Sequence, residues 1–130
     1  MSESTRRLRR YLETDLGACR DADVEARLTE LESLEKEADE PVLEADVTVL
    51  SALANETRYK IVRLLVLAGE QLCVCEIAPL MDVSQSAVSH ALSTLHEADL
   101  VTRHKEGKWR SYGPTQRAIA LVAALDGTRQ

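Results

Sequence analysis

Hydrophobic residues recur at helical spacing along much of the chain. Residues 5–16 place three leucines on one helical stripe, and Gly17 is a suitable stop. Residues 23–38 carry a narrow apolar seam between acidic faces, and Pro41 follows it. A narrow seam cannot form a core alone, so we expect residues 1–45 to be a helical arm that packs on the rest of the chain or, as we favour, on a second copy.

The folded core is expected in residues 46–130. Residues 47–54 predict a short helix, and Asn55 is a candidate N-cap for the helix that follows. That next helix, over residues 61–68, is apolar on nearly all sides, which is typical of a central, buried helix. Residues 116–125 are rich in alanine and predict a last helix.

Residues 72–100 have the pattern of a helix-turn-helix. A short helix over about residues 75–81 is followed by a turn and by Ser84, a good N-cap residue for a longer helix. That helix carries its apolar residues on one face and leaves polar ones on another: Gln85, Ser86, Ser89, His90 and Ser93. Short polar side chains suit base edges and phosphates, so we predict that these residues and Ser84 contact DNA. For His90, a solvent-exposed helical residue is an equal alternative.

A β-hairpin is expected beyond Leu100, with a two-residue turn at Glu106 and Gly107. The pairs that this turn sets opposite each other are Lys105 with Lys108, Arg103 with Arg110, and Val101 with Tyr112. Facing like charges destabilise an isolated hairpin, and an anion between them would remove that cost. We therefore predict a wing that grips DNA phosphate through Arg103, Lys105, Lys108 and Arg110. The alternative is a solvated edge that discourages strand pairing.

The net charge of −6 argues against DNA binding until it is divided along the chain. Residues 1–45 hold 13 acidic and 7 basic residues, whereas residues 46–130 hold 9 of each. All the excess acid therefore lies in the arm. Abundant acids with few lysines resemble proteins of salt-rich cytoplasms, and the alternative is an acidic surface that keeps the protein soluble.

Several classes of protein are excluded by the same inspection. A run of about 18 apolar residues, which a membrane span needs, occurs nowhere, and no apolar run follows the charged start, so we expect neither a membrane span nor a signal peptide but a cytoplasmic protein. Three cysteines, two of them one residue apart, make no disulfide framework, so reduced thiols are the default. We find no convincing catalytic base, nucleophile pair or phosphate loop, so we do not expect an enzyme.

Four stretches between residues 47 and 125 together resemble the arsenical-resistance-repressor (ArsR) family of winged-helix metalloregulators. They are LSALANETRYKIVRLL, LCVCEIAPLM, SQSAVSHALSTLHEADLV and KEGKWRSYG. Each stretch alone is weak evidence for the family, but the order and spacing of all four are specific to it. The resemblance implies a mainly α (α+β) fold, a winged helix-turn-helix with an N-terminal helical arm and a two-stranded β-wing. It also implies a homodimeric repressor that leaves operator DNA when a metal or metalloid binds.

The resemblance also indicates the sensing residues. Arsenite- and antimonite-responsive members carry thiolates in a Leu-Cys-Val-Cys segment, which here corresponds to Cys73 and Cys75. The family's usual third cysteine is replaced by Ala78, so Cys19 is the other candidate ligand. Zinc-sensing relatives carry an Asp/His set on the last helix that has no counterpart here. Soft sulfur ligands favour As(III) or Sb(III), with Cd(II), Pb(II) or Zn(II) as alternatives, and no cofactor is required.

The switch can be argued from helix geometry. Residues two apart on an ideal helix point about 200° apart, whereas residues two apart in an extended segment share a face. One ion can therefore take both thiolates of Cys73 and Cys75 only where the turn is extended or unwound, and we expect metalloid binding to distort the first turn of the short helix. DNA and metalloid would then compete through strain. The alternatives are two small buried hydrophobic cysteines, a thiol redox sensor of the same fold, and a thiol metal carrier that binds no DNA.

Overall fold

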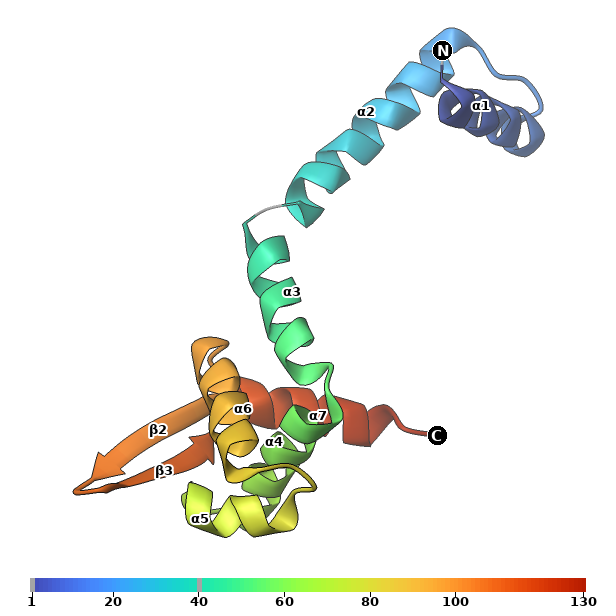
Figure 1. Cartoon of the computed structure of the whole chain (residues 1–130). Coiled ribbons are helices and arrows are strands. Elements are labelled where there is room, and N and C mark those ends of the chain that lie inside the picture. The colour runs from blue at the N-terminus through green and yellow to red at the C-terminus, as the bar shows by residue number, and fades with distance from the viewer. Residues whose placement is uncertain (1, 40) are drawn as a thin grey trace. The chain divides into compact units, whose positions relative to one another are not determined.

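A computed structural model describes residues 2–39 and 41–130 of the chain (Figure 1). The chain forms two units, one reaching to Leu43 and the other spanning Glu44–Gln130. Within the described ranges, no helix combines the length and the apolar character needed to cross a membrane.

The N-terminal unit contains two helices, α1 (Glu3–Leu16) and α2 (Asp21–Ala38). The hydroxyl of Ser2 accepts a hydrogen bond from the Thr5 N–H at 3.1 Å and so caps the start of α1. Gly17 ends α1 with φ +83°, the left-handed conformation that glycine adopts without strain. The expected arm is therefore helical, as the leucine stripe indicates.

Few apolar side chains are buried within this unit. Leu12 of α1 and Val24 of α2 are the buried ones among its described residues. At the junction of the helices, the guanidinium of Arg9 pairs with Asp21, at the first residue of α2. The larger apolar side chains left exposed are Tyr11, Leu16, Leu31 and Leu34. The unit thus has an apolar surface without a core of its own to cover it.

Helix α3 (Val42–Leu53) begins at the last two residues of the first unit and lies mostly in the second unit, and it is longer than the helix expected over residues 47–54. Two of its apolar side chains, Val47 and Leu50, are 52% and 57% exposed. Val49 and Ala52 are buried instead. This segment is apolar on more than one side, so the residue pattern alone did not identify the face that packs on its own chain.

Side chains at the α3–α4 junction satisfy the ends of both helices. Asn55 caps α4 (Glu56–Ala68) as expected, its side-chain oxygen accepting the Arg58 N–H at 3.0 Å. The Arg58 Nε in turn donates to the carbonyl of Ala52 at 2.6 Å, near the end of α3. Gly69 ends α4 with φ +68°.

A two-residue strand that the pattern did not predict, β1 (Leu72–Cys73), precedes the helix-turn-helix. The expected helix over residues 75–81 is shorter, because α5 (Val74–Ile77) passes directly into a 3₁₀ turn, η1 (Ala78–Leu80). Pro79 explains the change, since it has no N–H to continue the α-helical hydrogen bonds. The longer helix, α6 (Gln85–Glu97), follows where it was expected.

The wing is formed by β2 (Val101–Glu106) and β3 (Trp109–Pro114), and β1 pairs with the other edge of β3. The sheet is therefore three-stranded and antiparallel, in the order β1-β3-β2. The ribbon of β2 and β3 projects from the body of the unit (Figure 1). The expected turn was wrong by one residue, because Gly107 and Lys108 form the loop between Glu106 and Trp109.

Glycine chemistry accounts for the register. Gly107 has φ +61° at the first central position of the loop, where a two-residue hairpin loop of type II′ takes glycine. In the expected turn, Glu106 would hold that position and would carry a strain that glycine avoids. The observed partners are Val101 with Pro114, Arg103 with Tyr112, Lys105 with Arg110, and Glu106 with Trp109.

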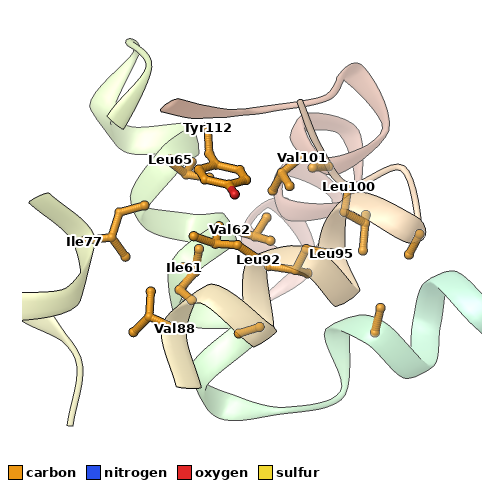
Figure 2. Close-up of a cluster of buried hydrophobic side chains, with 14 of the residues drawn as sticks. Ile61, Val62, Leu65, Ile77, Val88, Leu92, Leu95, Leu100, Val101 and Tyr112 are labelled. Carbon is orange, nitrogen blue, oxygen red and sulfur yellow. The ribbon is translucent and has the colours of Figure 1, made fainter. Parts of the chain in front are cut away.

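The core of the unit lies between α4, α5, α6 and the wing root (Figure 2). Its labelled side chains are Ile61, Val62, Leu65, Ile77, Val88, Leu92, Leu95, Leu100, Val101 and Tyr112. The last helix, α7 (Gln116–Thr128), adds Ala118 and Val122 and begins at the N-cap Thr115. One packed core therefore fixes α6 and the wing relative to each other.

Candidate nucleic-acid interface and thiol pair

The polar stripe predicted on α6 faces solvent. Gln85, Ser86, Ser89 and His90 are exposed, and Ser93 is half-buried. The opposite face, made of Val88, Ala91, Leu92 and Leu95, is buried in the core. Ser84 is the N-cap, and its hydroxyl oxygen accepts the Ala87 N–H at 3.1 Å while its own O–H stays free to donate. The core thus holds this helix with its short polar side chains outward.

The four predicted wing cations are also exposed: Arg103, Lys105, Lys108 and Arg110. Neither expected like-charge pair forms, because Lys105 faces Arg110 and Arg103 faces Tyr112. Lys108 lies in the loop instead of facing Lys105. One facing pair of cations remains that an anion would relieve.

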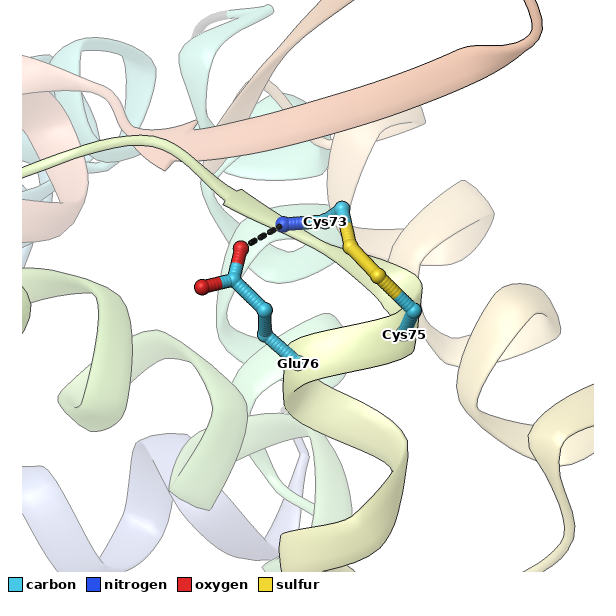
Figure 3. The surroundings of a disulfide bond; sticks show 3 residues. All are labelled: Cys73, Cys75 and Glu76. Atoms are coloured by element: carbon cyan, nitrogen blue, oxygen red, sulfur yellow. Dashed lines mark hydrogen bonds between the residues drawn. A yellow bond between two sulfur atoms is a disulfide. The ribbon is translucent and has the colours of Figure 1, made fainter.

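Cys73 and Cys75 lie where strand β1 becomes helix α5, and their sulfur atoms are joined as a disulfide (Figure 3). Cys73 is the N-cap of α5 and is extended, with φ −85° and ψ 163°. Of the two conditions expected for a shared ligand, an extended or an unwound segment, the structure has the extended one, because Cys73 lies outside the helix and its side chain meets that of Cys75. Distortion of the first turn by a bound metalloid stays a prediction. The expected reduced thiols are likewise not the form seen here.

A short hydrogen-bonded ring holds this pair in place. The Glu76 carboxylate accepts the backbone N–H of Cys73 at 3.0 Å (Figure 3). Cys73 is half-buried and Cys75 is exposed, so a thiophilic ion can reach the pair from solvent. The role of Glu76 was missed, although an acid three residues after an N-cap is a recognisable capping signal.

The pair is linked to both halves of the predicted DNA-contacting surface. Cys73 pairs with Ser111 of β3, the strand that carries Arg110 of the wing. Two residues beyond Cys75, Ile77 is fully buried in the core, and α5 packs against α6. A change in the position of Cys73 relative to Cys75 would therefore act on the wing and on helix α6.

No third ligand lies beside the pair among the residues that the structure describes. Over residues 2–39 and 41–130, no three His, Cys, Asp or Glu side chains gather closely enough to hold a metal ion. Cys19 lies between α1 and α2 in the N-terminal unit, where its thiol donates to the Arg20 carbonyl at 3.6 Å. The donor set available at Cys73 and Cys75 within the second unit is thus two sulfurs, which suits a thiophilic species.

Comparison with known proteins gives consistent matches along the chain. Residues 55–103 match the sequence model described as bacterial regulatory protein, arsR family. A Halobacterium salinarum protein named for the repressor of an arsenical resistance operon, ArsR, is 62% identical over 127 residues, which are 98% of either chain. The arsenical resistance operon repressor of Escherichia coli is 42% identical over 79 residues, covering 61% of this chain and 67% of its own.

A solved structure supports the fold of the second unit. The homodimeric winged helix-turn-helix DNA-binding domain of a Mycobacterium bovis protein has a TM-score of 0.59 and is 27% identical. The match covers 69% of this chain and 82% of that one. The Halobacterium salinarum match, in contrast, also extends over the N-terminal unit.

Proposed function

Because the chain belongs to the arsR family of bacterial regulatory proteins, we propose that it is a homodimeric repressor that binds operator DNA and is released by As(III) or Sb(III). The family consists of transcriptional regulators and not of enzymes. The observation that carries the proposal is the convergence of Cys73 and Cys75 beside the reading helix α6. The protein acts in the cytoplasm, where its operator lies.

The binding reaction requires the reduced pair. Arsenous acid and two thiols give a dithiolate arsenic hydroxide and two waters, one water for each As–S bond formed. The exposed Cys75 and the half-buried Cys73 are the two sulfurs that we assign to this reaction. The third arsenic position keeps its hydroxide or takes the thiolate of Cys19, a residue of the arm.

Release of DNA follows from the position of Cys73 in the sheet. An ion held by both sulfurs fixes the end of β1 relative to the first turn of α5. β1 is paired with the wing, and α5 packs on α6, so we infer that this constraint disfavours the arrangement that the two DNA-contacting elements take on DNA. By linkage, DNA and metalloid weaken each other's binding equally, by a coupling free energy of about 1 to 3 kcal/mol for a typical switch.

The exposed apolar residues of the second unit support dimerisation. A groove between α3, α4 and α7 is lined mainly by apolar side chains, including Leu50 and Leu125, both more than half exposed. The hydroxyl of Tyr59, which also lines the groove, is buried and has no hydrogen-bond partner in the part of the chain that the structure describes. A second copy would cover this face and could supply the missing partner. A dimer would also present two copies of helix α6, one for each half-site of an operator.

The arm over residues 1–45 is the second dimerisation element that we propose. Its uncovered residues Tyr11, Leu16, Leu31 and Leu34 suit packing against the arm of a second copy. Leu34→Glu in the full chain should raise the dimer dissociation constant in sedimentation equilibrium, whereas Ser33→Glu, on the neighbouring exposed position, should leave it unchanged. Equal dissociation constants for the two variants would reject a role for this face.

Titration of operator binding with arsenite tests the proposal. The reduced full chain is mixed with a duplex from the region upstream of its own coding sequence, and arsenite is added. We expect arsenite to release wild type, and Cys73→Ser and Cys75→Ser to bind DNA without a response. Cys19→Ser is the control: a shift to higher arsenite assigns the third thiolate to the arm, and an unchanged response leaves the pair sufficient. DNA binding that ignores arsenite in wild type would refute the proposal.

The disulfide between Cys73 and Cys75 favours a second candidate, a redox-responsive repressor of the same fold. In that case an oxidant without metalloid would release DNA and a dithiol reductant would restore binding. The same titration with Cd(II), Pb(II) or Zn(II) in place of arsenite tests the other thiophilic inducers. A thiol metal carrier would bind the ions but no DNA at all.

A further inference from the structure

Trp109 is the single tryptophan of the chain, and its side chain is 64% exposed. It is the first residue of β3 and faces Glu106 across the loop formed by Gly107 and Lys108. Tryptophan is one of the most strongly buried residue types on average, since its indole offers a large apolar surface. An indole left in water at the end of a projecting ribbon therefore indicates a contact that the isolated chain does not make.

The sheet register gives the wing two different faces. Side chains alternate along a strand, so Lys105 and Arg110 lie on one face, together with Arg103. Trp109 lies on the other face, which it shares with His104, Ser111 and its cross-strand partner Glu106. The end of the ribbon is thus cationic on one side, and on the other it carries the indole of Trp109 beside one acid, Glu106.

We propose that Trp109 packs against the sugar edges of the DNA minor groove when the wing binds, an inference that rests on the proposed function. Charge complementarity identifies the partner as duplex DNA, because residues 103–110 carry four cations and one acid, Glu106. The surface is also continuous with the DNA-contacting one, since α6 contacts β2. The deoxyribose edges supply apolar area, and base acceptors in the minor groove can take the indole N–H.

This contact has a salt dependence that differs from that of the cations. A lysine that neutralises a phosphate releases counterions, so its loss makes the slope of log affinity against log salt shallower by about 0.9 per phosphate. An indole on a sugar releases none. Trp109→Ala should therefore lower the affinity at every salt concentration by the same factor, whereas Lys108→Ala should change the slope.

The experiment uses the reduced full chain without arsenite and a duplex from the region upstream of its own coding sequence. Because Trp109 is the single indole, its emission reports its own environment directly. Adding DNA should shift that emission to shorter wavelength and protect it from acrylamide. Across a series of KCl concentrations, Trp109→Ala should weaken binding about ten-fold, equivalent to about 1.4 kcal/mol, without a change in slope.

Control variants separate the contact from a loss of structure. Trp109→Phe keeps an aromatic ring and should lose less affinity than Trp109→Ala, and both should keep the helical circular dichroism of wild type because the side chain is mainly exposed. Lys108→Ala should make the salt slope shallower and leave the acrylamide protection in place.

The outcomes distinguish this inference from the proposed function. Full DNA affinity in Trp109→Ala, or an indole that acrylamide quenches equally in the complex, overturns the indole contact and leaves the repressor intact. A blue shift that follows protein concentration without DNA assigns the indole to a second copy and also overturns it. Failure of wild type to bind the duplex overturns both.

Discussion

Ile77→Ala should weaken the link between the thiol pair and the reading helix. Among residues 74–80, which form α5 and η1, Ile77 is the one buried side chain, and it is fully buried. The change removes three carbons, or about 2.4 kcal/mol at about 0.8 kcal/mol per buried methylene, and the cavity adds to this. We therefore expect the free energy of unfolding to fall by about 2 to 5 kcal/mol.

Two measurements follow from that magnitude. Urea unfolding, followed by circular dichroism, gives the loss of stability. The ratio of DNA affinities without and with arsenite gives the coupling between the two sites, and it should fall toward one in Ile77→Ala because α5 no longer holds a fixed position on the core. Ile77→Val should cost about 0.5 to 1.5 kcal/mol and keep most of the coupling.

A control elsewhere in the core separates coupling from general destabilisation. Val122 of α7 is buried in the same core but belongs to neither α5 nor α6. Val122→Ala should lower the stability and leave the arsenite ratio at the wild-type value. An unchanged ratio in folded Ile77→Ala would refute the route through α5, and a loss of less than about 1 kcal/mol would contradict the packing at Ile77.

Three further predictions concern local structure. Gly107→Ala places a Cβ at φ +61°, so it should destabilise by about 1 to 2 kcal/mol in urea unfolding and weaken DNA binding, while Gly107→Asn loses less; equal stability of all three would contradict the turn. Asn55→Ala removes the cap of α4 and should cost about 1 kcal/mol in the same assay, whereas Asn55→Asp should be nearly neutral. The hydrogen bond from Arg63 at 2.7 Å holds the pKa of Asp126 below its usual value. Its stabilisation is present above the unfolded pKa of about 4 and is lost as the pH falls through the lowered folded pKa, so the melting temperatures of wild type and Asp126→Asn should differ most near neutral pH and converge in acid; a constant difference would assign the effect to packing.

Much of the helix-turn-helix could be predicted from short-range sequence signals. Ser84 and Asn55 cap their helices as expected, because a cap needs only a short polar side chain next to the first turn. The apolar spacing of Val88, Leu92 and Leu95 identified the buried face of α6 for the same reason, since all three lie on one element. Which exposed side chains contact DNA stays a prediction.

Features that depend on other elements or copies were not predictable in this way. Val47 and Leu50 are apolar at helical spacing, yet the packing that buries Val49 and Ala52 leaves them exposed. The sequence of α3 places apolar residues on two faces of the helix. The spacing alone does not identify which face packs against the chain's own core. In the proposed dimer, the exposed surface would be the one that a second copy covers.

The thiol pair shows how a boundary of one residue changes a mechanism. If Cys73 were helical, its sulfur would point away from that of Cys75, and binding one ion would require unwinding. As the N-cap, Cys73 keeps the extended backbone of β1 and places its sulfur next to that of Cys75. If the pair binds one ion as we propose, both sulfurs can reach it without melting of the helix.

The hairpin register differs from the expected one in its cross-strand partners, but each side chain stays on the face of the ribbon where it was expected. The observed partner of each β2 residue lies two positions beyond the expected one, and side chains alternate with a period of two, so Lys105 and Arg110 stay on one face. Trp109 would have faced His104 within the ribbon in the expected register. It faces Glu106 at the last pair before the loop instead, where the wing would reach farthest into a groove. The glycine that fixes the turn thus also places the indole at the end of the ribbon, where the proposed DNA contact requires it.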